Sequence, residues 1–258
     1  MKVVFFDIDG TLIDIDQRLT DSTAEAVRRL QHKGNLAILN TGRPICTIPK
    51  NVMALGFDGI VAACGTSVRL AGETLLEATI PQDLLSELLL LFERYNIKMI
   101  LEAPDYLYVQ DISDPDFAEE IENFKACGMD VFRSWNSPDV IANKLTYCTK
   151  MVGDISAVTD KLTEDFVRII YDEYMEDWLL KGHTKATGAQ LVLDRLGCTA
   201  KDSFTFGDSE NDIELFEYVG CAVAMGNSSA SVKQKSNYVT ADVNDDGILK
   251  GLLHFGLL

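Results

Sequence analysis

The chain has 258 residues, of which 47% are hydrophobic and 24% charged, a composition typical of a globular protein with a substantial core. Asp and Glu number 40 against 23 Lys and Arg, which gives a formal net charge of -17. Such a surface repels nucleic acid phosphates and anionic lipid headgroups, so we expect no nucleic acid and no membrane partner.

The beginning of the chain alternates apolar strands with helices. Apolar runs typical of buried strands occur at residues 3–6, 35–43 and 58–65. Apolar residues at helical spacing predict helices at 20–33 and, more weakly, at 48–55. This alternation predicts an α/β fold with a Rossmann-like, doubly wound parallel sheet.

The middle of the chain has a different pattern. A strongly apolar helix is expected at 84–95, and short elements follow it, with strands at 98–103, 106–111 and 142–149 and helices at 116–127 and 160–171. We interpret residues 83–181 as an inserted α+β domain, with boundaries near Pro81 and Lys181–Gly182. The core domain would then comprise residues 1–82 and 182–258.

Toward the end of the chain the alternation of helices and strands resumes. Helices are expected at 185–196, 210–219 and 229–236, and strands at 202–208, 221–227 and 237–240. These elements complete the parallel sheet of the core domain.

Three of the predicted strands are followed at once by polar residues. The stretches are DIDGT at 7–11, NTGR at 40–43 and GDSEND at 207–212. Ligands of open parallel sheets bind beyond the carboxyl ends of the strands. We therefore expect these three segments, which are distant in sequence, to meet in one site.

Carboxylates dominate this predicted site. Asp7, Asp9 and Asp208 would lie close together, and like charges at that range raise one another's pKa unless a cation neutralises them. Oxygen ligands without Cys or His suit Mg²⁺. A bound Mg²⁺ would also allow an anionic phosphate ester to approach.

The same residues support phosphoryl transfer. A carboxylate such as Asp7 can attack phosphorus and form an aspartyl-phosphate, while Asp9 protonates the leaving oxygen and later deprotonates water. Thr41 can donate a hydrogen bond to the transferred group, and Lys185 can supply a positive charge. Gly10 permits a close turn that directs backbone N–H groups to the phosphate.

Taken singly, several of these residues have simpler interpretations. Thr41 could be a helix cap, and Lys185 a solvated residue in the first turn of a helix. Asp212 could be an acid favoured by the helix dipole. Arg43 could bind an anionic substrate or pair with a surface acid, and the sequence favours neither.

The motifs together resemble a known family. DIDGT, NTGR, the lysine of KGHTKATGAQLV, and GDSENDIEL followed by AMGN are similar to the four motifs of the haloacid dehalogenase (HAD) superfamily. The chain most resembles the Cof-type phosphatases, which carry a large α/β cap between motifs two and three. The resemblance covers nearly the whole chain, and it implies that the inserted domain is this cap.

The resemblance also implies roles for individual residues. It implies Asp7 as nucleophile, Asp9 as general acid/base, and Thr41 and Lys185 as phosphate contacts. Mg²⁺ would be held by Asp7, the main-chain carbonyl of Asp9 and Asp208, with Asp212 as a supporting acid. The resemblance also implies that Asn211 lies near the metal or the phosphate. The candidate substrate-binding residues are Gly10, Gly42, Arg43 and Asn211. The chain departs from the family pattern at Cys64-Gly65-Thr66 and at Gly182-His183-Thr184.

We therefore expect a Mg²⁺-dependent phosphomonoester hydrolase of small phosphorylated metabolites, with sugar phosphates favoured. A phosphomutase and a non-catalytic module that binds Mg²⁺ or phosphate are the alternatives. The six cysteines form no C-x-x-C pair and have no zinc-ligand spacing, which indicates free thiols and a cytoplasmic location. A monomer or weak homodimer is expected.

Overall fold

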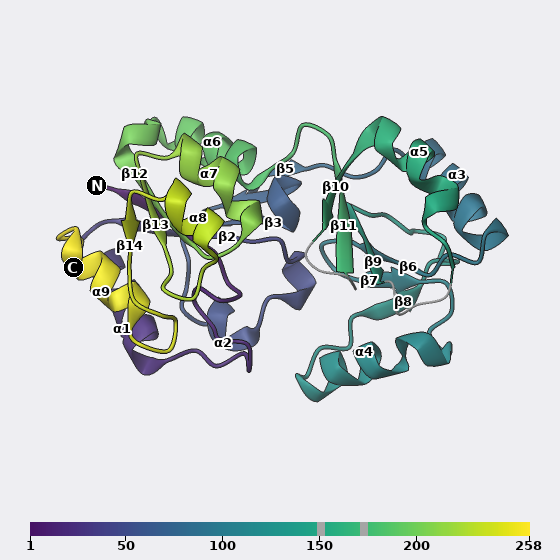
Figure 1. The fold of residues 1–258 in the computed structure, drawn as a ribbon, viewed down its shortest axis with the longest axis horizontal. Coiled ribbons are helices and arrows are strands. Elements are labelled where there is room, and N and C mark those ends of the chain that lie inside the picture. Colours follow the sequence, from purple (N-terminus) through teal and green to yellow (C-terminus); the bar gives the residue numbers. More distant parts are fainter. Residues whose placement is uncertain (149–152, 171–174) are drawn as a thin grey trace. The chain divides into compact units, whose positions relative to one another are not determined.

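The computed structural model describes residues 1–148, 153–170 and 175–258, and the chain separates into two compact units (Figure 1). The first unit comprises Met1–Gly42, Ile48–Leu76 and Thr184–Leu258, and the second comprises Arg43–Thr47 and Glu77–His183. The second unit thus begins before Pro81 and includes a short segment, Arg43–Thr47, that the sequence analysis placed in the core.

The first unit contains an eight-stranded sheet with the order β14-β13-β12-β1-β2-β3-β4-β5. Its strands are β1 (Val3–Phe6), β2 (Leu36–Asn40), β3 (Gly59–Ala62), β4 (Ser67–Leu70), β5 (Glu73–Glu77), β12 (Ser203–Gly207), β13 (Cys221–Ala224) and β14 (Tyr238–Val239). Strands β14 to β3 in this order run parallel, which confirms the predicted sheet. Strand β4 adds to β3 in the antiparallel direction, and the sequence analysis did not predict β4 or β5.

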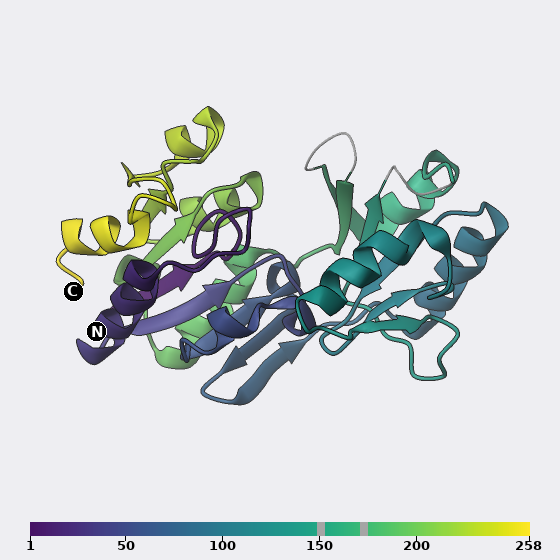
Figure 2. The same cartoon turned by 90° about the horizontal axis from the view of Figure 1, so that it is seen from below.

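Helices cover both faces of this sheet (Figure 2). One face packs against α1 (Asp21–His32), α2 (Lys50–Met53) and α9 (Gly247–His254). The other face packs against α6 (Lys185–Leu196), α7 (Ile213–Tyr218) and α8 (Ala230–Lys235). In β1, Val4 and Phe6 join the first core and Val3 and Phe5 the second, because successive side chains of a strand point to opposite faces. The unbroken apolar run at 3–6 is therefore buried on both sides.

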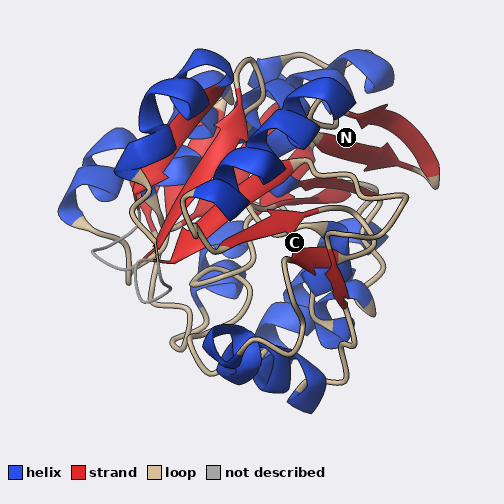
Figure 3. Cartoon of the chain, turned by 90° about the vertical axis from the view of Figure 1, so that its right-hand side faces the viewer, coloured by secondary structure: helices blue, strands red, loops and turns tan. Residues whose placement is uncertain are grey.

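The second unit contains a six-stranded sheet with the order β10-β11-β9-β6-β7-β8. Its strands are β6 (Met99–Glu102), β7 (Leu107–Val109), β8 (Phe132–Ser134), β9 (Lys144–Cys148), β10 (Phe166–Ile170) and β11 (Met175–Leu180). Helices α3 (Gln82–Arg94) and α5 (Ser156–Asp165) bury apolar residues on one face, and α4 (Pro115–Ala126) does so on the other. Figure 3 shows the helices and strands of the described chain, with helices lying beside most of the strands.

One predicted helix is wrong in its second half. The sequence analysis expected a helix at 160–171, but α5 ends at Asp165 and β10 follows directly. Residues 166–170 pair antiparallel with the next strand, β11, and the helical spacing of apolar residues at 160–171 does not reveal this pairing. Residue 171 lies outside the described residues.

The cysteines are free thiols. Cys46 donates a hydrogen bond to the carbonyl oxygen of Ala103, and burial raises the pKa of its thiol to about 12. Such a thiol is protonated at neutral pH and unreactive. Among the residues that the structure describes, no helix is long and apolar enough to cross a membrane.

Candidate active site

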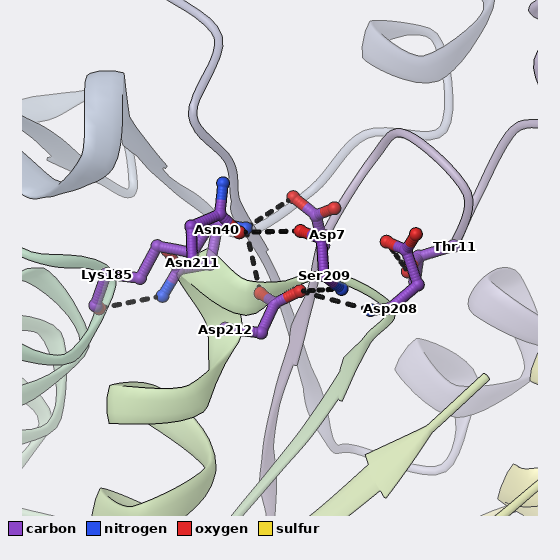
Figure 4. Close-up of polar contacts among 8 residues, drawn as sticks. All are labelled: Asp7, Thr11, Asn40, Lys185, Asp208, Ser209, Asn211 and Asp212. Atoms are coloured by element: carbon purple, nitrogen blue, oxygen red, sulfur yellow. Dashed lines mark hydrogen bonds and ion pairs between the residues drawn. The ribbon is translucent and has the colours of Figure 1, made fainter. Parts of the chain in front are cut away.

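The predicted polar segments begin where β1, β2 and β12 end, at one edge of the first unit's sheet (Figure 4). Asp7 directly follows β1, and its N–H donates to the carbonyl oxygen of Phe206 at 3.0 Å. Since β1 and β12 are adjacent parallel strands, Asp7 and Asp208 emerge at the same edge. The sheet order therefore brings together two carboxylates about 200 residues apart.

Lys185 links two of the acids. Its Nζ lies 2.8 Å from Asp7 Oδ1 and 2.8 Å from Asp212 Oδ1, and all three side chains are buried. The lysine is the first residue of α6, where Thr184 is the N-cap and accepts a hydrogen bond from the N–H of Thr187. The cap fixes where the helix begins and hence where the lysine side chain starts.

Asp212 organises the loop that carries Asp208. Its Oδ2 accepts hydrogen bonds from the N–H groups of Asp208 and Ser209, at 3.1 and 3.2 Å. A Cβ on Gly207 would lie 2.5 Å from the Asp212 carboxylate, so only glycine fits there. The fully buried Asp212 is therefore held both by backbone donors and by Lys185.

Carboxylate oxygens of Asp7, Asp208 and Asp212 lie within 4.8 Å of one another. Asp208 also accepts a hydrogen bond from Thr11 Oγ1 at 3.3 Å. Gly10 has φ +70°, and a Cβ there would lie 2.3 Å from Asp208 Oδ2. The glycine of motif one therefore leaves the space that the Asp208 carboxylate occupies.

The cluster contains three carboxyl groups and one ammonium group in close proximity. Burial raises the pKa of Asp7 well above its usual range despite the opposing influence of Lys185, and neighbouring carboxylates add to the rise. Burial, together with Asp212, raises the pKa of Asp208 to about 7. Burial disfavours the charged form of Lys185, but Asp212 and Asp7 outweigh it and raise the pKa of the lysine. Lys185 is therefore the charged partner of Asp7, whose ionised form burial disfavours.

This donor set fits a divalent cation. If all three carboxylates were ionised beside the one ammonium, two negative charges would remain, which one divalent ion would neutralise. The ligand atoms in the cluster are oxygens, as Mg²⁺ prefers. Burial is the main cause of the raised pKa of Asp7 and Asp208, and a cation bound among these acids would favour their ionised forms.

The carboxylate of Asp9 is not part of this cluster. Among the described residues, Asp212 completes the group with Asp7 and Asp208, whereas the sequence analysis had grouped Asp9 with them. The chain turns back after Ile8, whose carbonyl oxygen accepts from the N–H of Leu12 at 2.9 Å. Asp9 therefore lies on an exposed turn, while Asp7 is at the strand end.

The remaining predicted residues fall into different places. Thr41 is buried directly after β2, and Gly42 follows it in the first unit. Arg43 groups with the second unit, where its Nη1 donates to the carbonyl oxygen of Thr47 at 2.9 Å. Asn211 lies beside the cluster in Figure 4, and its Oδ1 accepts from Ser209 Oγ at 2.9 Å.

Two asparagines at the site had no predicted role. Asn40 Nδ2 donates to the main-chain carbonyl oxygen of Lys185 at 3.0 Å. Asn227 Nδ2 donates to the carbonyl oxygen of Gly10 at 2.8 Å, and its Oδ1 accepts from the N–H of Val243. Both lie within motifs that the sequence analysis singled out, NTGR and AMGN. Their position in a motif was the available signal, but their partners are not evident from sequence.

Comparisons with known proteins agree with this geometry. A family model described as haloacid dehalogenase-like hydrolase matches residues 4–252. The Bacillus subtilis protein named "Putative phosphatase YkrA" is 28% identical over 257 residues, covering 100% of this chain and 98% of that protein. The 5-amino-6-(5-phospho-D-ribitylamino)uracil phosphatase YitU of B. subtilis is 26% identical over 266 residues, covering 98% of this chain and 97% of that protein. The structure of the HAD subclass IIB sugar phosphatase BT4131 matches with a TM-score of 0.82 and 25% identity, over 100% of both chains.

Proposed function

Since the chain belongs to the haloacid dehalogenase-like hydrolases and is a phosphatase of that family, we propose that it hydrolyses small phosphomonoesters through an aspartyl-phosphate, with Mg²⁺ as cofactor. One observation carries the proposal. Asp7, at the end of the central strand β1, is buried, is bonded to Lys185, and shares a cluster with Asp208 and Asp212.

Asp7 is the proposed nucleophile. One of its carboxylate oxygens forms a bond to phosphorus while the bond from phosphorus to the ester oxygen breaks, and Asp9 gives its proton to the departing alkoxide. Asp9 then takes a proton from water, which attacks the aspartyl-phosphate and releases inorganic phosphate and the free Asp7 carboxylate. The exposed turn position of Asp9 suits a group that exchanges protons with the leaving group and with water.

Other residues of the first unit stabilise charge in this scheme. The Lys185 ammonium faces the Asp7 carboxylate and offsets negative charge on the transferred phosphoryl group. The Thr41 hydroxyl donates a hydrogen bond to the same phosphoryl group. Asp7, Asp208 and the main-chain carbonyl of Asp9 would hold Mg²⁺, with Asp212 in support. When bound, Mg²⁺ would supply the positive charge that lets an anionic ester approach the carboxylates.

We further propose sugar phosphates and related polyol phosphates as the substrate class. YitU is named for a phosphoribitylamino substrate, and BT4131 is described as a sugar phosphatase. Gly10, Gly42, Arg43 and Asn211 are the proposed contacts to substrate. The free cysteines favour the reducing cytoplasm, and a monomer or weak homodimer is proposed.

The test is phosphate release from a panel of sugar, polyol and nucleoside phosphates and an aryl phosphate, with Mg²⁺ or with EDTA. Wild type is compared with Asp7→Asn and with Asp14→Asn. Asp14 is a suitable control, because it is a buried acid of the same loop. Within the described part of the chain, its Oδ1 accepts backbone hydrogen bonds from Asp16 and Arg18, which an amide oxygen can also accept.

We expect Mg²⁺-dependent release that Asp7→Asn lowers by at least about a thousandfold and Asp14→Asn leaves nearly unchanged. Activity that survives Asp7→Asn would contradict the assigned nucleophile. Conversion of a substrate to its positional isomer without release of inorganic phosphate would instead indicate a phosphomutase. Binding of phosphate without any turnover would indicate the non-catalytic module.

A further inference from the structure

We propose that Asn40, the last residue of β2, is a positioning residue that fixes Lys185 for phosphoryl transfer. This inference rests on the proposed function, because Asn40 acts through a lysine to which that function gives a role. Both residues belong to the first unit, and the sequence motifs predict no contact between them.

The contact runs from a side chain to a backbone. Asn40 is fully buried, and its Nδ2 donates to the main-chain carbonyl oxygen of Lys185 at 3.0 Å. Lys185 in turn presents its Nζ to Asp7 and Asp212. The amide of Asn40 therefore holds the end of the lysine that lies farthest from the chemistry.

That anchor matters because a lysine side chain is long and has four rotatable bonds. The ammonium can be placed by its partners at one end or by its backbone at the other. During the reaction Asp7 changes charge as its oxygen bonds to phosphorus, so the contact at the ammonium end changes too. The backbone anchor is then the part of the arrangement that stays constant.

The surroundings of α6 are built for a close fit. A Cβ on Gly65 would lie 2.1 Å from the carbonyl oxygen of Thr184, and a Cβ on Gly188 would lie 2.4 Å from Val61 Cγ1. The loop after β3 thus packs directly on the first turn of α6. Asn40 adds a directed hydrogen bond to a junction in which the backbones already touch.

Stability alone does not explain an asparagine here. Among the described residues, Asn40 Oδ1 has no hydrogen-bond partner although the side chain is fully buried. An amide oxygen buried without a donor opposes folding, and an apolar residue of similar size would avoid this cost. The hydrogen bond to Lys185 is the feature that such a replacement would lose.

The test is a double-mutant cycle with Asn40→Leu and Lys185→Met. The measured quantities are kcat/KM on an aryl phosphate, the Kd for inorganic phosphate by calorimetry, and the midpoint of urea unfolding. Asn35→Leu is the matched control, because Asn35 directly precedes β2, at the end opposite Asn40. Its side chain accepts a hydrogen bond from the N–H of Lys2 and donates one to the carbonyl oxygen of Leu257, and both partners lie away from the proposed active site.

We expect Asn40→Leu to lower kcat/KM by about 10- to 100-fold and to weaken phosphate binding, without lowering the urea midpoint. In the Lys185→Met background the same change should cost less than about threefold. Asn35→Leu should lower the midpoint and leave kcat/KM intact. If Lys185→Met does not fold, the comparison of kcat/KM and urea midpoint between Asn40→Leu and Asn35→Leu tests the role of Asn40.

Three results would overturn the role of Asn40. These are wild-type kcat/KM in Asn40→Leu, an equal loss in the Lys185→Met background, and a loss of activity that merely follows a loss of stability. If the wild-type protein hydrolyses esters and Asn40→Leu is equally active, the role of Asn40 is overturned and the proposed function stands. A wild-type protein that neither hydrolyses esters nor binds phosphate overturns both.

Discussion

At the residue scale, glycine is required where motif one meets motif four. Gly10 combines a left-handed backbone, φ +70°, with the close approach of Asp208 Oδ2 to the position of a Cβ. The first property alone would cost a substituted residue about 1–2 kcal/mol of backbone strain. The second displaces a carboxylate that we propose as a metal ligand, so the two effects can be separated by experiment.

We expect Gly10→Ala to lower kcat by at least about tenfold and to raise the Mg²⁺ concentration needed for half-maximal activity, because Asp208 must move. Gly72→Ala is the control, since Gly72 has φ +82° but nothing within 4 Å of its Cβ position. Both variants should lose similar stability in urea, and only Gly10→Ala should lose activity. Equal Mg²⁺ dependence in the two variants would contradict the close-approach argument.

At the element scale, β6, β9 and β11 of the second unit share a buried polar cluster. Lys144 Nζ lies 3.0 Å from Glu102 Oε2 and 2.7 Å from Asp177 Oδ2. Thr146 Oγ1 lies 2.6 Å from Glu102 Oε1 and 2.8 Å from Asp177 Oδ1. A hydroxyl has one proton, so one of these two contacts needs a proton from the carboxyl group. Burial raises the pKa of Glu102 despite the opposing influence of Lys144, and so favours the protonated form of this acid.

Lys144→Met should destabilise the second unit by about 3–5 kcal/mol, because it leaves two buried acids without the ammonium that bridges them. Lys144 lowers the pKa of Glu102, so its removal raises that pKa further above the unfolded value. Stability is then lost as pH rises through the raised pKa, and the penalty should be larger at pH 8 than at pH 5.

Urea unfolding at these two pH values measures the penalty. Lys161→Met is the control, since Lys161 bridges Glu87 and Glu164 on the surface and its loss should change stability little at either pH. A penalty for Lys144→Met that grows toward acid would contradict the raised pKa of Glu102.

At the scale of the whole molecule, each unit has its own hydrophobic core. The chain contains two tryptophans, Trp135 and Trp178, and both are buried in the second unit. Tryptophan fluorescence therefore reports unfolding of the second unit alone, while far-ultraviolet circular dichroism reports both. Independent cores predict that the two signals separate when one unit is destabilised.

Leu88→Ala should remove about 2–5 kcal/mol from the second unit, because Leu88 is fully buried in α3. The fluorescence midpoint in urea should then fall below the circular dichroism midpoint. Leu30→Ala is the matched change in α1 of the first unit, and it should not lower the urea midpoint of the fluorescence transition. Coincident transitions in both variants would mean that the units unfold as one.

The sequence by itself determined the parallel sheet and the order of the motifs at its strand ends. Apolar runs and helical spacing are local signals, and they located β1, β2, β12, α1 and α6 to within a few residues. Parallel strands end at one edge of the sheet, so Asp7 and Asp208 could be expected in one site, and the family resemblance added Lys185. The structure brings the three residues together.

Only the tertiary structure decided which side chains meet there. It left the Asp9 carboxylate outside the cluster of Asp7, Asp208 and Asp212, joined Asn40 to Lys185, grouped Arg43 with the second unit, and made residues 166–170 a strand. Each of these depends on contacts between separate segments of the chain or on the path of the turn after Ile8. Local patterns carry no information about such contacts, because their energy arises only when the packed fold brings the partners together.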